Sequence, residues 1–143
     1  MSFDLKIENG DISIGQDGTV KIVSDNSKLR QDIIKILLTP LHENKFHQEY
    51  GNEIGSLKIG QIIDRELLEL DIRASVEISI RKLMSLQREQ SKRQYVSPGE
   101  VIADILDISA SRDINDPRLY IISVSILTQK LTTITESVTV KII

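Results

Sequence analysis

Apolar and polar residues alternate at the start of the chain. Residues 3–7 switch between the two at every position, which predicts a half-buried strand. Asn9-Gly10 is a strong turn signal. Asp17-Gly18 is the usual hairpin dipeptide, and it lies between the short apolar runs 12–14 and 19–23. The pattern therefore predicts short N-terminal strands joined by tight turns.

Two longer segments repeat apolar residues at helical spacing. Residues 27–39 predict a helix that packs between layers, because apolar side chains cover much of its circumference. This helix should end at Thr39, since Pro40 disfavours helix at that residue. Its N-cap candidates are Asp25, Asn26 and Ser27. Residues 61–93 predict either one bent helix or two. The apolar stripes comprise Leu29, Ile33, Ile36 and Leu37, which should be buried, and then Leu68, Ile72, Val76, Ile80 and Leu83.

The last third of the chain reads as three strands. The runs 101–110, 119–129 and 132–142 are rich in Ile, Val, Thr and Ser, and turns are expected at residues 113–117 and at Gln129-Lys130. Consecutive strands with short links pair antiparallel. The predicted fold class is α+β, with a short N-terminal β-hairpin, two to three helices and a C-terminal three-stranded antiparallel meander. We expect a single domain over the whole chain.

Composition narrows the function classes. The chain has 143 residues, of which 40% are hydrophobic and 27% charged, so it is globular. Aromatic residues make up 3% and Trp is absent, so the core is aliphatic. A net charge of −3 disfavours general binding to nucleic acid or to an anionic membrane. Without cysteine there is no disulfide and no thiol nucleophile. We expect a soluble protein made without an export signal.

Candidate catalytic and metal-binding residues are few. His42 and His47 lie five positions apart, whereas the zinc signature HExxH needs a spacing of four, so no metal site is expected. A glycosidase needs two carboxylates at a set separation, one with a raised pKa, and Glu43 with Glu49 is the pair to consider. We expect no catalytic residue and no cofactor. The basic run 81–93 is interpreted either as a solvated helix face or as a docking surface for an acidic partner.

A series of short motifs runs in order along nearly the whole chain: Gly10-Asp11, Gln31-Asp32-Ile33 with Ile36-Leu37, Thr39-Pro40, Glu43, Tyr50-Gly51, the helical run 72–86 and Pro98-Gly99-Glu100. This series resembles the gene-25-like family of phage baseplate wedge proteins, which includes the P2-type W protein and the baseplate subunit TssE of type VI secretion. The chain departs from the family pattern at two positions. Asn44 occupies the place of the usual Arg, and Gln48 lies near the place of the usual Pro.

The resemblance implies a non-enzymatic role in the baseplate wedge of a contractile phage tail. The implied partners are baseplate wedge core proteins, the tail sheath protein and tail tube-proximal proteins, and the implied location is the virion, after synthesis in the host cytoplasm. Members of the family start polymerisation of the sheath, and strand exchange between sheets would be the physical means. Two alternatives stay open: a baseplate-associated, lysozyme-like glycosidase, and a baseplate subunit of a non-phage contractile injection system.

The resemblance also suggests which residues contact partners. Docking onto the wedge core is expected at or beside the matched motif, where the missing Arg removes a bidentate carboxylate binder and Lys45 can replace it only as a point charge. The sheath contact is expected along an edge of the C-terminal sheet, where alternate apolar side chains would fix the register. The expected partner-binding residues are Glu43, Asn44, Lys45, Tyr50 and Gly51 for the wedge, and Ile134, Val138 and Val140 for the sheath.

Overall fold

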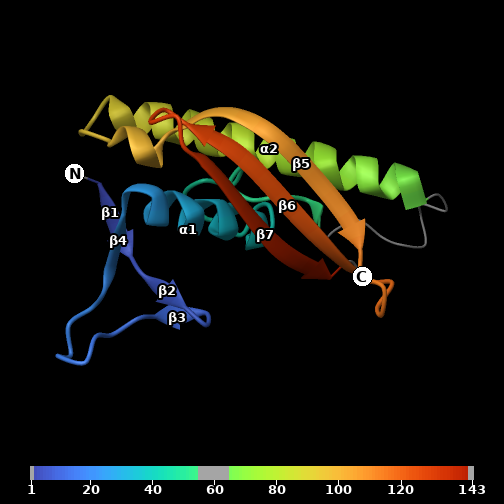
Figure 1. Cartoon of the computed structure of the whole chain (residues 1–143), viewed down its shortest axis with the longest axis horizontal. Helices are drawn as coiled ribbons and strands as arrows, with labels where there is room; N and C mark the ends of the chain where they lie inside the picture. Colours follow the sequence, from blue (N-terminus) through green and yellow to red (C-terminus); the bar gives the residue numbers. More distant parts are fainter. Residues whose placement is uncertain (1, 55–64, 142–143) are drawn as a thin grey trace.

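The structure is a computed structural model that describes residues 2–54 and 65–141. Figure 1 shows a three-stranded sheet beside two helices, with a small ribbon of N-terminal strands projecting from one end. The elements in chain order are β1 (Phe3–Leu5), β2 (Ile7–Glu8), β3 (Asp11–Ile12), β4 (Ile22–Ser24), α1 (Asp25–Leu38), α2 (Arg65–Ser91), the 3₁₀ turn η3 (Pro98–Glu100), β5 (Ile102–Arg112), β6 (Leu119–Thr128) and β7 (Thr133–Lys141). The predicted α+β class is confirmed.

The C-terminal strands form the predicted antiparallel meander in the order β5-β6-β7. The central strand β6 alternates inward and outward side chains, and its inward residues Ile122, Val124 and Ile126 are fully buried. Hydroxyl pairs line the other face, where Ser123 Oγ lies 2.7 Å from Ser137 Oγ and Ser125 Oγ lies 2.9 Å from the Thr135 hydroxyl. The sheet therefore has one apolar face and one wet face, as antiparallel sheets commonly do.

Both helices contribute to the core on the apolar face. Helix α1 packs along β7 and α2 along β5, and the two helices also contact each other. The predicted stripes are confirmed, because every residue of both is at most 6% exposed. Helix α1 ends at Leu38 with Thr39 as its C-cap, as Pro40 requires. Helix α2 is continuous from Arg65; the first residues of the predicted segment, 61–64, lie outside the described part of the chain.

The N-terminal strands differ from the half-buried strand predicted for residues 3–7. The chain forms β1 and β2 there, and its apolar residues face solvent in cross-strand pairs: Leu5 with Ile22, and Ile7 with Ile12. The polar side turns inward instead, because Lys35 of α1 binds the Asp4 carboxylate at 2.6 Å. The Asn9-Gly10 turn is confirmed, since both residues have the positive φ of a type I′ hairpin.

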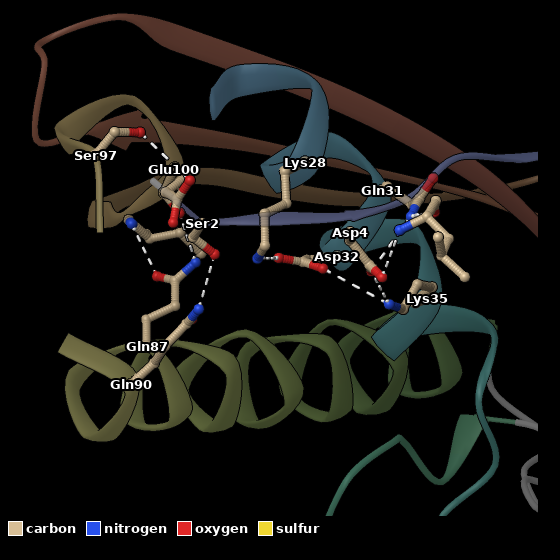
Figure 2. Close-up of polar contacts among 12 residues, drawn as sticks. Ser2, Asp4, Lys28, Gln31, Asp32, Lys35, Gln87, Gln90, Ser97 and Glu100 are labelled. Atoms are coloured by element: carbon tan, nitrogen blue, oxygen red, sulfur yellow. Dashed lines mark hydrogen bonds and ion pairs between the residues drawn. The ribbon is translucent and has the colours of Figure 1, made fainter. Parts of the chain in front are cut away.

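Two polar networks fasten the N-terminal segment to the helices (Figure 2). In the first, Lys35 of α1 binds Asp4 of β1 and also lies 3.8 Å from Asp32, which forms a buried ion pair with Lys28 within α1. Gln31 of the same helix donates to the Leu5 carbonyl at 2.7 Å. In the second, Gln90 of α2 donates to Ser2 Oγ at 2.9 Å. The neighbouring Gln87 donates to the Glu100 carbonyl at 2.9 Å and so joins α2 to the turn η3. These bonds compensate for the small apolar area that the strands themselves bury.

The start of α1 departs from the predicted capping. Ser24 occupies the N-cap position and makes no side-chain capping bond. Asp25, one of the three predicted caps, is the first helical residue with φ of 52°, and its carboxylate accepts a hydrogen bond from Ser97 Oγ at 2.8 Å. A Cβ at Gly99 would overlap this carboxylate. Asp25 thus joins α1 to the turn η3 instead of capping the helix.

Candidate functional site

The loop that follows α1, residues 40–53, carries the residues expected to dock on the wedge. Its two ends are tied together, since Leu41 N donates to Asn52 O and Asn52 N donates to Thr39 O, each at 3.0 Å. The Asn52 side chain donates to the carbonyls of Ile36 and Leu37. Those carbonyls have no partner within the helix, so Asn52 satisfies the C-terminus of α1. The loop therefore begins and ends at fixed points.

Gly51 lies where the end of this loop passes close to the Thr39-Pro40 backbone. Its φ is 121°, and a Cβ would lie 2.5 Å from the Thr39 carbonyl oxygen and 2.9 Å from that of Pro40. Its own carbonyl accepts a hydrogen bond from Ser79 Oγ of α2 at 2.7 Å. A side chain cannot be placed here without moving backbone. The structure therefore places Gly51 at the base of the loop, away from its exposed tip.

Tyr50 lies beside Gly51 and is half-buried against the core. Burial, and to a smaller extent the nearby carboxylates of Asp32 and Asp4, together raise the pKa of its phenol to about 12. The ring faces the cleft between α1 and α2, together with Asn44, Lys28 and Asp32. Of the five residues expected at the wedge contact, Tyr50 and Gly51 thus lie at the base of the loop.

The tip of the loop carries the other three. Glu43 and Lys45 are exposed, while Asn44 is half-buried and shapes the turn, because its Oδ1 accepts from Phe46 N at 3.0 Å and from His47 N at 3.2 Å. The turn holds Phe46 out with 92% of its surface exposed. Phe46 was not among the residues predicted from the sequence. The chain has only two Phe residues, and a Phe within a polar loop indicates a possible contact residue.

The carboxylates of the loop do not have the environment of a glycosidase acid. Glu43 is exposed. Glu49 is also exposed, and Lys82 of α2 holds its carboxylate at 2.8 Å and lowers its pKa. A general acid needs the opposite shift, produced by an apolar pocket. Among residues 2–54 and 65–141, no three His, Cys, Asp or Glu side chains gather as a metal site would require.

The basic run on α2 is largely paired with acidic neighbours. Arg81 binds Glu77 at 2.8 Å, Lys82 binds Glu49 and Lys92 binds Glu89 at 2.9 Å. These contacts favour the interpretation as a solvated helix face, in which exposed pairs contribute little stability. No helix in the described part of the chain has the length and apolar character needed to cross a bilayer.

The outer edge of β7 is the second candidate surface. One contact shows which backbone groups of β7 point away from β6. Arg30 Nη1 donates to the Thr135 carbonyl at 3.3 Å from outside the sheet, so the backbone groups of Thr135 point outward. Backbone groups of an antiparallel strand alternate in direction, so those of Ser137 and Thr139 point outward as well. Within residues 2–54 and 65–141, the sheet order β5-β6-β7 leaves this edge without a strand neighbour. The edge has the hydrogen-bonding groups that an added strand needs.

The opposite edge, β5, is irregular. Its pairing with β6 shifts register twice, between Ile102 and Asp104 and again between Ile105 and Asp107. Both aspartates are exposed. Bulges and charges of this kind protect an edge against further pairing. The pairing of β7 with β6 runs without a shift from Thr133 to Lys141, so β7 is the better template.

The three residues expected to fix register lie on the helix-facing row of β7. Ile134 and Val138 are 1% and 7% exposed and belong to the protein's own core. Val140 is half-buried and lies at the rim of a groove of about 470 Å³. Apart from Val140, the apolar lining of the groove comes from the end of α1 and the start of the loop, at Leu37, Leu38, Pro40 and Leu41.

One protein-family model matches the N-terminal part of the chain, which includes the loop. The model for contractile injection system sheath initiators matches residues 1–83, which is more than half of the chain. The match spans the N-terminal strands, α1, the loop and α2 as far as Leu83. The chain belongs to the contractile injection system sheath initiator family, so it is a structural component of such a system.

The comparison of structures supports the fold. The chain is similar to a solved protein of Geobacter sulfurreducens for which a tail lysozyme role has been suggested, with a TM-score of 0.60 and 14% sequence identity over 80% of this chain and 88% of the other. At that identity the likeness concerns the fold alone. No curated protein matches the chain.

Proposed function

We propose that this protein is a baseplate wedge subunit that binds wedge core proteins and starts polymerisation of the tail sheath by accepting a β-strand. In a phage this role places it in the virion, after synthesis in the host cytoplasm, near the tail tube. The observation that carries the proposal is the regular, outward-facing edge of β7, in a chain whose family is defined by sheath initiation. Addition of a strand to β7 could start the sheath of a non-phage contractile injection system in the same way.

Strand addition explains how an initiator can work without catalysis. A strand of the first sheath ring would pair with the free backbone groups at Ser137 and Thr139 and continue the sheet. Each sheath subunit would then offer the next one an equivalent edge. The bulged β5 edge restricts addition to one side of the sheet, which gives growth a single direction.

Proline at Thr139 tests the mechanism. The Thr139 N–H points outward, so Thr139→Pro removes a donor that the incoming strand needs and leaves the pairing with β6 intact. Thr139→Ala is the matched control, because it shortens the same side chain and keeps the N–H. Baseplates with the proline variant should assemble and fail to start sheath, as seen by electron microscopy, while the alanine variant should start it. Normal sheath growth from the proline variant contradicts strand addition.

The glycosidase alternative receives no support from the carboxylates of the loop. Glu49 has a lowered pKa, and both Glu43 and Glu49 are open to solvent. We therefore expect purified protein to leave peptidoglycan intact in a turbidity assay that includes an active lysozyme as a positive control. Turnover that persists in a Glu43→Gln, Glu49→Gln double variant would reveal an enzyme with other residues, and turnover lost in it would restore this pair.

A further inference from the structure

Only part of the β7 edge is accessible. Arg30 of α1 lies against the first half of the strand, where it donates to the Thr135 carbonyl and binds the Glu136 carboxylate at 2.5 Å. An incoming strand would have to displace this side chain to pair there. On the C-terminal side of Arg30, the outward backbone groups from Ser137 to Lys141 have no strand neighbour within the described residues. The accessible edge is therefore short and lies at the C-terminal end of β7.

The groove at the end of α1 borders this accessible half. Val140 lines the groove from the sheet, and the other apolar lining comes from Leu37, Leu38, Pro40 and Leu41. The polar residues His42, Asn52 and Glu53 complete the lining. Leu38 is 56% exposed at its mouth. Residues directly opposite each other on neighbouring strands carry their side chains on the same face of a sheet. A residue of an added strand that lies opposite Val140 would accordingly direct its side chain into the groove.

We propose that this groove receives a large apolar side chain from the extended sheath segment that pairs with Ser137 to Lys141. This inference rests on the proposed sheath contact and adds to it the chemistry of the partner. The free backbone edge selects an extended chain, and the aliphatic walls of the adjoining groove select a Leu, Ile, Met or Phe at the position opposite Val140. The neighbouring residues of the segment would face the hydroxyl-lined side and be polar. Backbone pairing thus supplies affinity, and the groove supplies register and specificity.

Leu38 is the position at which to test the groove. Leu38→Gln keeps a good helix former on an exposed site and makes the mouth of the groove polar. The matched control is Leu70→Gln, because Leu70 of α2 is also 56% exposed and lies beside β5. We expect Leu38→Gln to weaken binding of purified sheath protein to initiator-loaded baseplates about tenfold, because the partner would cover only the exposed part of the Leu38 side chain. Leu70→Gln should bind as wild type does.

The outcomes separate this inference from the proposal beneath it. Weak binding with Thr139→Pro together with normal binding of Leu38→Gln would overturn the groove and leave strand addition standing. Normal binding of both variants would overturn both. Equal weakening by Leu38→Gln and Leu70→Gln would also overturn the groove, since the effect would then be general.

Chemical crosslinking gives an independent measurement. The chain has no cysteine, so Leu38→Cys can be labelled at a single site with a benzophenone maleimide. After irradiation in the presence of sheath protein, mass spectrometry should find the adduct on an apolar residue within an extended segment. The labelled Leu70→Cys protein should give no sheath adduct. Adducts at Leu38 that fall on a sheath helix, or on polar residues alone, would overturn the inference.

Discussion

Gly51 shows how a single residue can set the position of a whole loop. With φ of 121° and two backbone carbonyls in the space of a Cβ, it occupies a conformation that only glycine adopts without strain. Its resemblance to a family motif suggested partner binding. In the structure Gly51 lies at the base of the loop and Tyr50 is half-buried beside it, so both residues position the loop tip. Their direct contact with a partner stays a prediction.

Gly51→Ala should therefore destabilise the fold strongly. Left-handed strain alone costs on the order of 1–3 kcal/mol, and the overlap with the Thr39 and Pro40 carbonyls adds to it. The matched control is Gly18→Ala, because Gly18 has φ of 81° and open space around its Cβ position. Urea unfolding should show a clearly larger loss for Gly51→Ala than for Gly18→Ala. Equal losses would mean that the carbonyls move aside easily.

Tyr50 should make stability fall at alkaline pH. Its folded-state pKa of about 12 exceeds the unfolded value of 10.0, so the neutral phenol stabilises the fold fully below pH 10. This contribution is lost as the pH rises from about 10 to about 12. In Tyr50→Phe the loss over that window should shrink by on the order of 1 kcal/mol, allowing for the partial exposure of the ring. Unfolding curves at pH 9 and pH 11.5 measure this, and identical losses in both proteins would contradict it.

Among the elements, α1 was the most predictable. A period of 3.6 over thirteen residues identifies a stripe, and Pro40 marks its end. The three C-terminal strands were equally clear, because turn residues separate long β-branched runs. The N-terminal strands were predicted as strands with the wrong side inward. Alternation of apolar and polar residues shows that the two faces of a strand differ, but not which face packs inward. Here the polar face packs inward, because Asp4 binds Lys35 and Gln31 of α1.

The stripe of α1 provides the stability prediction at this scale. Ile33 is fully buried, so Ile33→Ala should cost about 2–5 kcal/mol through lost burial and the cavity left behind. Leu38→Ala on the same helix is the control, because Leu38 is more than half exposed, and it should change the free energy of unfolding by less than about 1 kcal/mol. Chemical denaturation measures both. A loss below about 1 kcal/mol for Ile33→Ala would place the helix on the surface.

At the scale of the whole molecule, the two candidate surfaces meet at the end of α1. The loop tip rises from the same Thr39-Pro40 step that helps to line the groove at β7. Sequence motifs located the loop, because Glu43 and Tyr50-Gly51 stand in a recognisable order. They could not locate the free edge, because the β5 bulges appear only in its pairing with β6. The contact of Arg30 with the Thr135 carbonyl also joins segments that are 105 residues apart in the sequence.

The wedge contact is the prediction that involves the molecule as a whole. Glu43 and Phe46 stand exposed on a loop whose base is fixed, so their side chains can bind a partner without a cost in ordering the backbone. Glu43→Ala should weaken incorporation into baseplate wedges while the free energy of unfolding stays within about 0.5 kcal/mol of wild type. Phe46→Ala should weaken it more, about tenfold or beyond, because exposed aromatic anchors dominate such interfaces.

Glu89→Ala is the matched control for the wedge contact, since Glu89 is an exposed carboxylate that belongs to the last turns of α2 and is not part of the loop. Co-sedimentation of each variant with assembled wedges measures incorporation, and urea unfolding of the isolated proteins measures stability. If Glu43→Ala unfolds the isolated protein, Glu43 has a structural role. If Glu43→Ala and Phe46→Ala both enter wedges as well as Glu89→Ala does, the loop tip is not the wedge contact, and the cleft beneath Tyr50, lined by Lys28 and Asp32, becomes the surface to test.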